Sequence, residues 1–375
     1  MPSPGHKEHH ADGGVEMKEF GVSLYPGRAS LDENKAYLDL AGRYGCTRVF
    51  TCLISMKGEK MREEFAHLAG YAKTLGMQVI ADVSPKIFTD LNITCDDLSF
   101  FSRLNLSGIR LDLGFSGHEE SVMTFNPYGL KIILNMSSGT KYLDNILCFN
   151  PKKENILGCH NFYPHRYTGL SREHFLRCSR QFKDKGIRTA AFVSSRTATY
   201  GPWEVSEGLC TLEEHRHLPV DVQAKDLFNT NLIDDCYISN CFASEAEFKA
   251  LSHLDRDILT LNIELNKNVP EVERKIILDE LHFNRGDISA YMIRSTQSRV
   301  KYGQQHFPLF NAPHIHRGDV LIESSLYDRY AGELQIALQE MSNSGKTNVV
   351  GKVAGDEIYL LDNIRPWQKF KFQLK

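Results

Sequence analysis

Short apolar runs that end in polar residues recur along this chain, and a helical pattern follows each of them. Eight runs are recognisable: Phe20–Tyr25, Arg48–Ser55, Met77–Ser84, Gly108–Asp112, Lys131–Ser137, Ile156–Tyr163, Ile187–Ser195 and Ile233–Asn240. Eight strand–helix units are the number that closes a parallel (β/α)8 barrel, or TIM barrel. The runs are apolar on both faces, as expected where helices cover the outside and packed side chains fill the inside. No GxGxxG follows the first run, which disfavours a nucleotide-binding wound sheet.

The segments between these runs carry the start and stop signals of helices. Ser30 and Glu33 have the spacing of a capping box ahead of the first helix. That helix has an apolar stripe at the i, i+3, i+4, i+7 spacing of a buried face, formed by Tyr37, Leu40, Ala41 and Tyr44. Glycines expected to end a helix in the left-handed conformation, just before the next strand, are Gly45, Gly76 and Gly186.

The strand–helix rhythm changes after Leu254. From Leu259 to Asn266 apolar and polar residues alternate, which predicts a strand with one face in water. Further strands are predicted at Tyr291–Ser295, Val320–Ser324, Leu334–Leu338, Val349–Val353 and Ile358–Asp362. We therefore expect an α/β chain in three parts: residues 1–16 as a disordered head or a remnant of cloning, 17–256 as the barrel, and 257–375 as a small closed antiparallel β domain.

Composition excludes several classes of function. The 375 residues are 42% hydrophobic and 24% charged, and the net charge of −3 gives no bulk attraction to nucleic acid or to a membrane surface. No stretch approaches the roughly 18 apolar residues of a membrane helix, and the head has no apolar core of a signal peptide. The nine cysteines lack CxxC spacing, as expected for reduced thiols in the cytosol. We expect a cytoplasmic protein, and the sequence does not indicate its oligomeric state.

Carboxylates close two neighbouring strands of the predicted barrel. Asp82 ends the third run and Asp112 the fourth, and Arg110 shares a strand face with Asp112 because side chains alternate along a strand. Two carboxylates at the barrel mouth can supply the acid and the anion for glycosidic cleavage, while an arginine keeps one of them ionised. We predict Asp82 and Asp112 as catalytic residues and Arg110 as a binding residue. A structural Asp–Arg pair is the alternative.

Other side chains near the strand ends are candidates for holding a substrate. His160 could transfer a proton or bond a hydroxyl, although histidines at strand ends are also structural donors. Asn135 and Asn161 offer neutral donors and acceptors for sugar hydroxyls or an amide. Tyr25 and Tyr163 could stack on sugar rings or simply pack.

An anion is expected to bind at the loops after the seventh and eighth strands, where such barrels often hold phosphate. These loops contribute Arg196 and Asn240, and Arg294 offers a second site if the β domain leans over the barrel mouth. Beyond the seventh run, Thr211 is expected to cap a helix with Glu214 as its capping-box partner. A catalytic acid from this loop is an alternative to the strand-end carboxylates.

A metal centre is disfavoured. Asp82, Asp112 and His160 could ligate a divalent cation, but no HxH or HExxH spacing joins them. We expect neither a metal nor another cofactor.

Across the strand ends and the β domain the chain resembles the 6-phospho-N-acetylmuramidase family, long catalogued as conserved outer surface proteins. The matching stretches are Gly21–Pro26, Phe50–Leu53, Gly108–Asp112, Asn126–Leu130, Gly158–Pro164, Gly208–Arg216, Arg285–Asp287, Tyr291–Thr296 and Gly332–Gln335. Together they span the chain from Met17, which we expect to be the natural start.

The resemblance implies a (β/α)8 barrel followed by a cyclophilin-like β-barrel domain. It also implies hydrolysis of the β-1,4-linked disaccharide of N-acetylmuramic acid 6-phosphate and N-acetylglucosamine, in the cytoplasm, after phosphorylating uptake, as a step of peptidoglycan recycling. The expected partner is thus this small phosphorylated disaccharide. The resemblance carries no assignment of catalytic residues, so those predictions rest on the strand ends.

Two other functions stay open at this point. A sugar-phosphate aldolase or isomerase could use the same barrel, although a Schiff-base aldolase needs a lysine at a strand end and Lys131 opens its run at the other end. A carbohydrate-binding protein would hold a cell-wall fragment without cleaving it.

Overall fold

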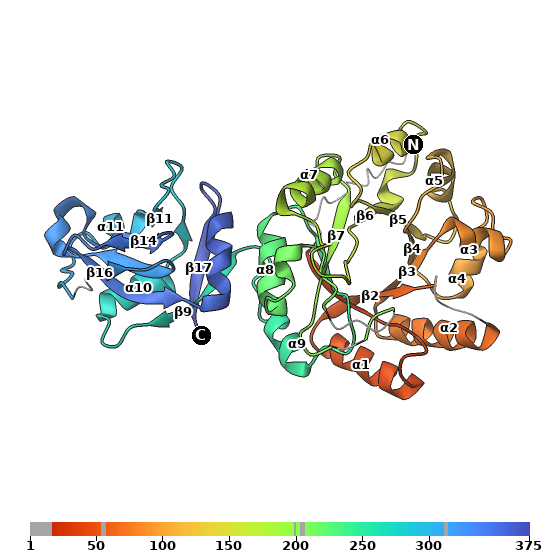
Figure 1. Cartoon of the computed structure of the whole chain (residues 1–375), viewed down its shortest axis with the longest axis horizontal. Coiled ribbons are helices and arrows are strands. Elements are labelled where there is room, and N and C mark those ends of the chain that lie inside the picture. Colours follow the sequence, from red (N-terminus) through yellow and green to blue (C-terminus); the bar gives the residue numbers. More distant parts are fainter. Residues whose placement is uncertain (1–16, 54–57, 199, 203–206, 311–313) are drawn as a thin grey trace, which may run out of the picture.

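The computed structural model describes residues 17–53, 58–198, 200–202, 207–310 and 314–375. The expectation of a disordered head concerns residues 1–16, which lie outside these ranges. Two domains lie side by side, and the C-terminus lies in the second of them (Figure 1).

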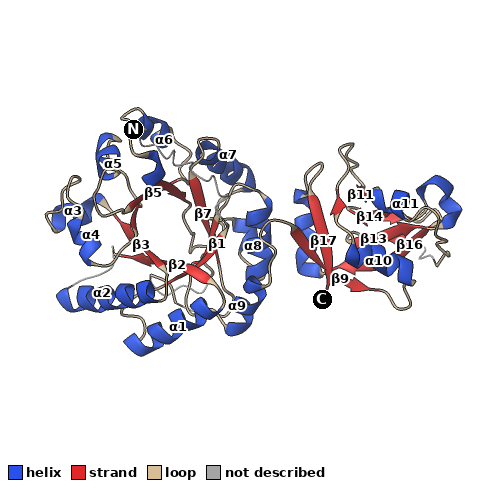
Figure 2. Ribbon diagram, turned by 180° about the vertical axis from the view of Figure 1, so that it is seen from behind, coloured by secondary structure: helices blue, strands red, loops and turns tan. Residues whose placement is uncertain are grey.

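The first domain is a closed parallel barrel, which confirms the predicted fold class. Its strands pair in sequence order, and β8 returns to pair with β1. The strands are β1 Glu19–Ser23, β2 Cys46–Cys52, β3 Gln78–Val83, β4 Gly108–Leu111, β5 Lys131–Asn135, β6 Ile156–Cys159, β7 Arg188–Val193 and β8 Asp235–Ile238. Figure 2 shows the strands as a ring with helices around it. All eight apolar runs of the sequence therefore contain barrel strands.

Helices follow the strands and cover the ring. They are α1 Leu31–Arg43, α2 Glu59–Thr74, α3 Pro85–Asp90, α4 Ser99–Arg103, α5 His118–Met123, α6 Tyr142–Leu147, α7 Arg172–Lys183, α8 Val220–Asn229 and α9 Glu245–Ser252, with 3-10 turns η1 Lys153–Asn155 and η2 Glu213–His215. The Ser30–Glu33 capping box is present at α1. Gly45, Gly76 and Gly186 have positive φ, as the sequence predicted.

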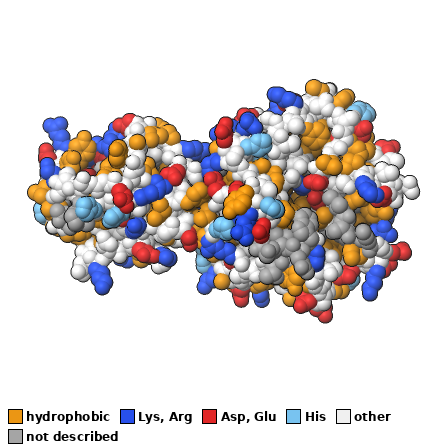
Figure 3. All heavy atoms as spheres, in the orientation of Figure 1, with side chains coloured by type: hydrophobic (Ala, Val, Ile, Leu, Met, Phe, Trp, Pro, Cys, Tyr) orange, Lys and Arg blue, Asp and Glu red, His pale blue; other side chains and the backbone are white. Residues whose placement is uncertain are grey.

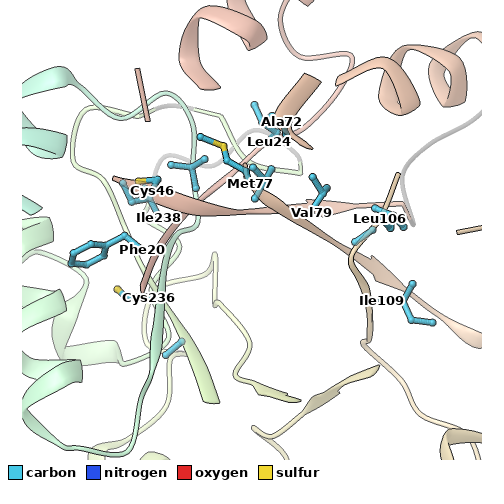
Figure 4. Packing of buried hydrophobic residues seen from close by; sticks show 14 of the residues in the cluster. Phe20, Leu24, Cys46, Ala72, Met77, Val79, Leu106, Ile109, Cys236 and Ile238 are labelled. Atoms are coloured by element: carbon cyan, nitrogen blue, oxygen red, sulfur yellow. The ribbon is translucent and has the colours of Figure 1, made fainter. Parts of the chain in front are cut away.

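Side chains alternate between the inside and the outside of the barrel wall. Figure 4 shows part of the outer layer, where Phe20, Val79 and Ile109 from the strands pack with Ala72 of α2 and Met77. Inside, a separate apolar layer is formed by Phe50, Ile80, Ile133, Cys159, Ala190, Phe192 and Tyr237. This inner layer fills the barrel, so the interior is a packed core and not a pore. In such barrels a substrate binds at the C-terminal end of the strands.

The inner layer leaves no room for a side chain at Gly21. A Cβ atom there would lie 2.5 Å from Cδ1 of Tyr237, its register partner on β8. We expect Gly21→Ala to lower the free energy of unfolding by about 1–3 kcal/mol, as overpacked cores do. Gly355→Ala is the matched control, because no heavy atom lies within 4 Å of its added Cβ. Urea unfolding measures both, and equal stability of the two variants would contradict the packing argument.

The second domain is built on a seven-stranded sheet in the order β10-β17-β9-β16-β13-β14-β11, with a separate pair β12–β15. The sheet is antiparallel except for the parallel pair β9–β17. A backbone hydrogen bond of 3.0 Å from Arg285 N to Arg294 O links its two edges. The sheet is thus nearly closed, in agreement with the expected β-barrel domain.

The elements of this domain follow β8 and α9 in the chain. They are β9 Leu259–Leu265, α10 Glu271–Asp279, β10 His282–Phe283, β11 Met292–Ser295, α11 Gln297–Lys301, β12 His314–Ile315, β13 Asp319–Glu323, η3 Ser325–Tyr330, β14 Leu334–Ala337, β15 Met341–Ser342, β16 Thr347–Val353, η4 Gly355–Asn363 and β17 Lys369–Leu374.

The predicted strand at Ile358–Asp362 is wrong, because this segment belongs to the 3-10 helix η4. Glu357 and Leu360, three residues apart, share one side of such a helix, and both are buried. A short apolar run without alternation does not distinguish a strand from a buried helical turn.

A buried ion pair and a hydrogen bond join the two domains. Lys225 Nζ of α8 lies 2.6 Å from Glu357 Oε1 of η4, and both side chains are buried. Asp226 of the same helix accepts a hydrogen bond from Tyr359 OH at 3.2 Å. Breaking a buried pair by removing one partner is costly, so we infer a firm interface. We propose 256/257 as the domain boundary, in the link between α9 and β9.

The surface carries charges of both signs scattered over both domains, which meet at a narrower waist (Figure 3). In the described ranges no helix has the length and apolar character needed to span a membrane. Cys159, Cys236 and Cys241 are buried free thiols.

Candidate active site

Two carboxylates and one arginine meet at the C-terminal end of the barrel. Arg110 Nη1 donates to Asp82 Oδ1 at 2.6 Å and lies 3.5 Å from Asp112 Oδ1. Asp82 and Arg110 are register partners on β3 and β4, so neighbouring inward positions bring them together. Because both oxygens approach the same nitrogen, they lie within roughly 6 Å of each other, close to the separation of retaining glycosidases.

The two carboxylates have different environments. The Asp82 side chain is 12% exposed, whereas that of Asp112 is 40% exposed. Burial raises the pKa of Asp82 to about 6, against the opposing effect of Arg110 and with a further contribution from the Asp112 charge. A carboxyl with a raised pKa beside a solvated carboxylate is the arrangement that separates an acid from an anion.

Neutral polar groups surround this trio. The Asn161 Oδ1 atom accepts a hydrogen bond from Arg110 Nη2. Asn135 Nδ2 donates to the backbone oxygen of Asp112 at 3.2 Å, and its Oδ1 accepts from Ser137 N at 3.0 Å. Tyr163 is partly buried, which raises the pKa of its hydroxyl, while hydrogen bonds with Ser137 and Asn161 oppose that rise. Three predicted binding residues, Asn135, Asn161 and Tyr163, are therefore gathered around Arg110.

The structure does not bring His160 to the barrel mouth. Its side chain is fully buried on the outer side of β6, where Nδ1 lies 3.1 Å from Ser137 Oγ and Nε2 lies 2.9 Å from Ser179 Oγ. The ring packs against Phe175 of α7. Burial lowers the pKa of His160 to about 3, so the ring is neutral at physiological pH. This geometry gives His160 the structural role that was the alternative at the sequence level.

The polar groups of Tyr25 and Asn240 are bonded to the backbone of the chain. Tyr25 is buried and its hydroxyl donates to the Ser239 carbonyl at 2.6 Å. Asn240 exchanges two hydrogen bonds with the backbone of Ser195, at 2.8 and 2.9 Å. Both residues fix the loops after β7 and β8 rather than present a free surface to a ligand.

Arg196 extends into a cavity of about 270 Å³ between those two loops. Its Nη2 donates to the His217 carbonyl. The other arginines of the cavity are paired: Arg166 Nε lies 3.0 Å from Glu207 Oε1, and Arg216 Nη2 lies 2.6 Å from Glu213 Oε2. Among the described side chains, no carboxylate pairs with the Arg196 guanidinium.

Glu247 was not identified from the sequence, although the Ser244-to-Glu247 spacing is that of a capping box and signals it. Its Oε1 accepts from Arg196 N at 2.9 Å, and its Oε2 accepts from Ser195 Oγ at 2.8 Å and from Ser244 N at 2.9 Å. Burial raises the pKa of Glu247, but these hydrogen bonds and one from Thr197 outweigh burial and lower it. Glu247 thereby positions the loop that carries Arg196.

Arg294 lies in the second domain, away from the barrel mouth. Its Nε donates to Glu333 Oε1 at 2.9 Å. The second domain packs beside α8 and does not cover the ring (Figure 2). The β domain does not lean over the barrel mouth, so Arg294 does not supply the second anion site predicted from the sequence.

The expected Thr211 cap is wrong. η2 begins after Leu212 without a side-chain cap, and Thr211 Oγ1 instead accepts from Phe192 N at 2.9 Å and donates to Asn161 O at 2.8 Å. Glu214 pairs with Arg172 at 2.6 Å. A threonine side chain near a turn can bond nearby backbone groups as well as cap a helix. Here its hydroxyl accepts from a backbone amide of β7 instead of from the helix. Trp203 of the same loop lies outside the described residues.

The part of the chain that is described contains no group of three metal-ligating side chains.

Two family models match almost the whole chain. Residues 20–253 match the N-terminal domain of 6-phospho-N-acetylmuramidase, and residues 259–373 match its C-terminal domain. The chain belongs to the 6-phospho-N-acetylmuramidase family. It is therefore a glycosidase built on a barrel, and its substrate is a phosphorylated sugar.

Solved structures agree with this muramidase fold. A B. cereus protein is 46% identical with a TM-score of 0.88, over 95% of this chain and 99% of that one. A conserved Enterococcus faecalis protein is 22% identical with a TM-score of 0.70, over 95% and 96% of the two chains. A search of curated proteins found no match. For a glycosidase, carboxylates at the strand ends are the groups suited to cleave the glycosidic bond.

Proposed function

We propose that the chain hydrolyses the β-1,4 bond between N-acetylmuramic acid 6-phosphate and N-acetylglucosamine at the mouth of its barrel. The observation that carries this proposal is the Asp82–Arg110–Asp112 trio, two carboxylates on one arginine at adjacent strand ends. Family membership supplies the substrate class, and the trio supplies an acid and an anion at a suitable separation.

The environments of the two carboxylates suggest their roles. Asp82, whose pKa is raised to about 6, donates its proton to the glycosidic oxygen as the N-acetylglucosamine leaves. Asp112, the more exposed of the two, orients the 2-acetamido group, whose oxygen attacks the anomeric carbon. Water then opens the resulting oxazolinium ring and returns a proton to Asp82. Arg110 holds both carboxylates, and Asn135 and Asn161 position sugar hydroxyls or the amide.

The 6-phosphate is assigned to Arg196. β7, which precedes this residue, lies four strands from β3 around the closed barrel, so a sugar bound at Asp82 extends across the mouth toward the cavity. The guanidinium has no paired carboxylate in the described chain, and guanidinium groups bind phosphate bidentately. We place the reaction in the cytoplasm, as a step of peptidoglycan recycling.

Incubation of the purified chain with the phosphorylated disaccharide, with and without a chelator, tests the function. Mass spectrometry is expected to show free N-acetylglucosamine in equal amounts in both reactions. A chelator-sensitive reaction with other products would favour a metal-dependent aldolase or isomerase. An intact disaccharide that still binds the chain would favour a carbohydrate-binding protein.

Arg196→Gln is expected to raise KM for the phosphorylated disaccharide by about 10- to 100-fold with a smaller change in kcat, because a charge-assisted contact to phosphate is lost. Arg274→Gln, an exposed arginine of α10, is the control. Steady-state kinetics measures both. An unchanged KM in the Arg196 variant would remove Arg196 from the phosphate site.

The short carboxylate separation predicts retention at the anomeric carbon. Proton NMR during the first minutes of hydrolysis is expected to show β-configured N-acetylmuramic acid 6-phosphate before it equilibrates. Initial formation of the α anomer would require a water between the carboxylates and would contradict the proposed attack by the acetamido group.

A further inference from the structure

A cavity lies between the two domains, away from the barrel mouth. It has a volume of about 460 Å³, within the usual range for small-molecule sites. Its walls are the C-terminal end of α8, the link around Asp255–Leu259 and the segment Arg365–Lys369 that leads into β17. Barrel helices run opposite to the strands, so the C-terminal end of α8 is at the end of the barrel away from Asp82.

Cationic side chains from both sides line this cavity. Arg256 donates to the Lys18 carbonyl at 2.6 Å and lies over the Phe20 ring. Arg365 donates to the carbonyls of Asn229 and Thr230, at 3.0 and 3.1 Å.

Lys369 Nζ lies 3.4 Å from the Trp367 carbonyl. Within the ranges that the structure describes, none of Arg256, Arg365 and Lys369 forms an ion pair with a carboxylate. Burial and the nearby Arg180 both lower the pKa of Arg365, which shows that positive charge is crowded there.

The lining has two acidic residues, Asp255 and Asp257, against the three cations Arg256, Arg365 and Lys369, so they offset only part of this charge. Asp255 Oδ1 accepts from the backbone N–H groups of Asp257 and Ile258, at 3.0 and 2.9 Å, and so holds the link in a turn. Asp257 is 3.9 Å from Lys18, which lies outside the lining. The cavity therefore keeps an excess of positive charge that an anion would compensate.

An aromatic side chain lies beside these cations. Trp367 is 62% exposed although it is one of the largest apolar side chains. One part of its indole rests on Gly286 and Phe283, and its backbone has φ +61, which is unusual for a bulky residue. The backbone N–H of Trp367 donates to the Asn284 carbonyl at 2.7 Å and maintains this conformation. An exposed indole offers an apolar face on which a pyranose ring can stack.

We propose that this interdomain cavity is a second binding site, for a phosphorylated sugar, separate from the catalytic mouth. The phosphomonoester binds between Arg256, Arg365 and Lys369, and the sugar ring stacks on Trp367. Because the lining comes from both domains, the bound ligand bridges α8 and β17.

The fluorescence of Trp367 tests this proposal directly. The chain has two tryptophans, so the Trp203→Phe variant of the full chain leaves Trp367 as the single reporter. Titration with glucose 6-phosphate is expected to give a saturable change in emission. Arg365→Gln and, as a milder exposed change, Lys369→Gln are each expected to weaken this binding by about tenfold in that background.

Matched titrations separate the proposal from its alternatives. Arg196→Gln, at the barrel mouth, is expected to leave the Trp367 fluorescence response unchanged. Loss of the response in this variant would show that the signal comes from binding at the catalytic end. Inorganic phosphate and N-acetylglucosamine are expected to bind more weakly than glucose 6-phosphate. Equal binding of phosphate would overturn the assignment to a sugar, and no saturable response to any ligand would overturn the site. Hydrolysis of the disaccharide is scored separately, so failure here leaves the proposed function intact.

Discussion

Asp82→Asn and Asp112→Asn are each expected to lower kcat for the phosphorylated disaccharide by about 100- to 10,000-fold, the range of general acid–base contributions. An amide at position 82 has no acidic proton for the leaving oxygen. An amide at position 112 lacks the charge that stabilises the attacking acetamido group. Both substitutions keep the shape of the side chain, so the far-ultraviolet circular dichroism of each variant is expected to match that of the parent chain.

A substrate with a good leaving group distinguishes the two roles. From the 4-nitrophenyl glycoside of N-acetylmuramic acid 6-phosphate, 4-nitrophenolate leaves without protonation. The Asp82→Asn variant is therefore expected to hydrolyse this substrate at a rate much closer to that of the parent chain, and the Asp112→Asn variant is not. Asp90→Asn, an exposed aspartate of α3 paired with Lys86, serves as the control. Near-normal turnover of the disaccharide by either active-site variant would remove that residue from the mechanism.

The barrel was accessible from the sequence because its evidence is repeated and local. Each strand is a short apolar run, and helices such as α1 have an amphipathic stripe with a cap, here Ser30 with Glu33. Eight repetitions specify closure even where single boundaries shift by a residue or two. In the second domain the signal is weaker, since β10, β12 and β15 contain two residues each and pair only through long-range contacts.

The site was accessible in part, for a reason that follows from strand geometry. Asp82, Arg110 and Asp112 came together because they end adjacent strands with the same inward parity. His160 also follows a strand, but it has the opposite parity from Asn161 and faces α7. Barrel strands are apolar on both faces, so the sequence does not reveal which of two successive polar residues points inward.

Contacts between distant segments were beyond the sequence. Arg110 reaches Asn161 from a position 51 residues earlier, and Glu247 of α9 holds the loop of Arg196 from a position 51 residues later. Such pairs depend on how the barrel closes, and no local period encodes them. The same holds for the Lys225–Glu357 pair between the domains.

The pH dependence of turnover is expected to report Asp82 directly. If Asp82 must be protonated to act, kcat falls well above its pKa of about 6 by about tenfold per pH unit, and by about 50-fold between pH 6 and 8. Saturating substrate is required, because the second ionisation of the substrate phosphate is also near pH 6 and affects binding. In Asp82→Asn the residual rate is expected to lose this dependence.

Stability supplies an independent measurement of the same group. The pKa of Asp82 is raised from 3.8 to about 6 on folding, so between these values the folded chain binds more protons than the unfolded chain. Its contribution to stability is therefore greatest at low pH and falls by about 3 kcal/mol as pH rises through this window. Urea unfolding at several pH values is expected to show this fall in the parent chain relative to Asp82→Asn. If instead kcat rises through pH 6 while the stability of the parent still falls through this window, Asp82 works as the anion and the proton donor is Asp112.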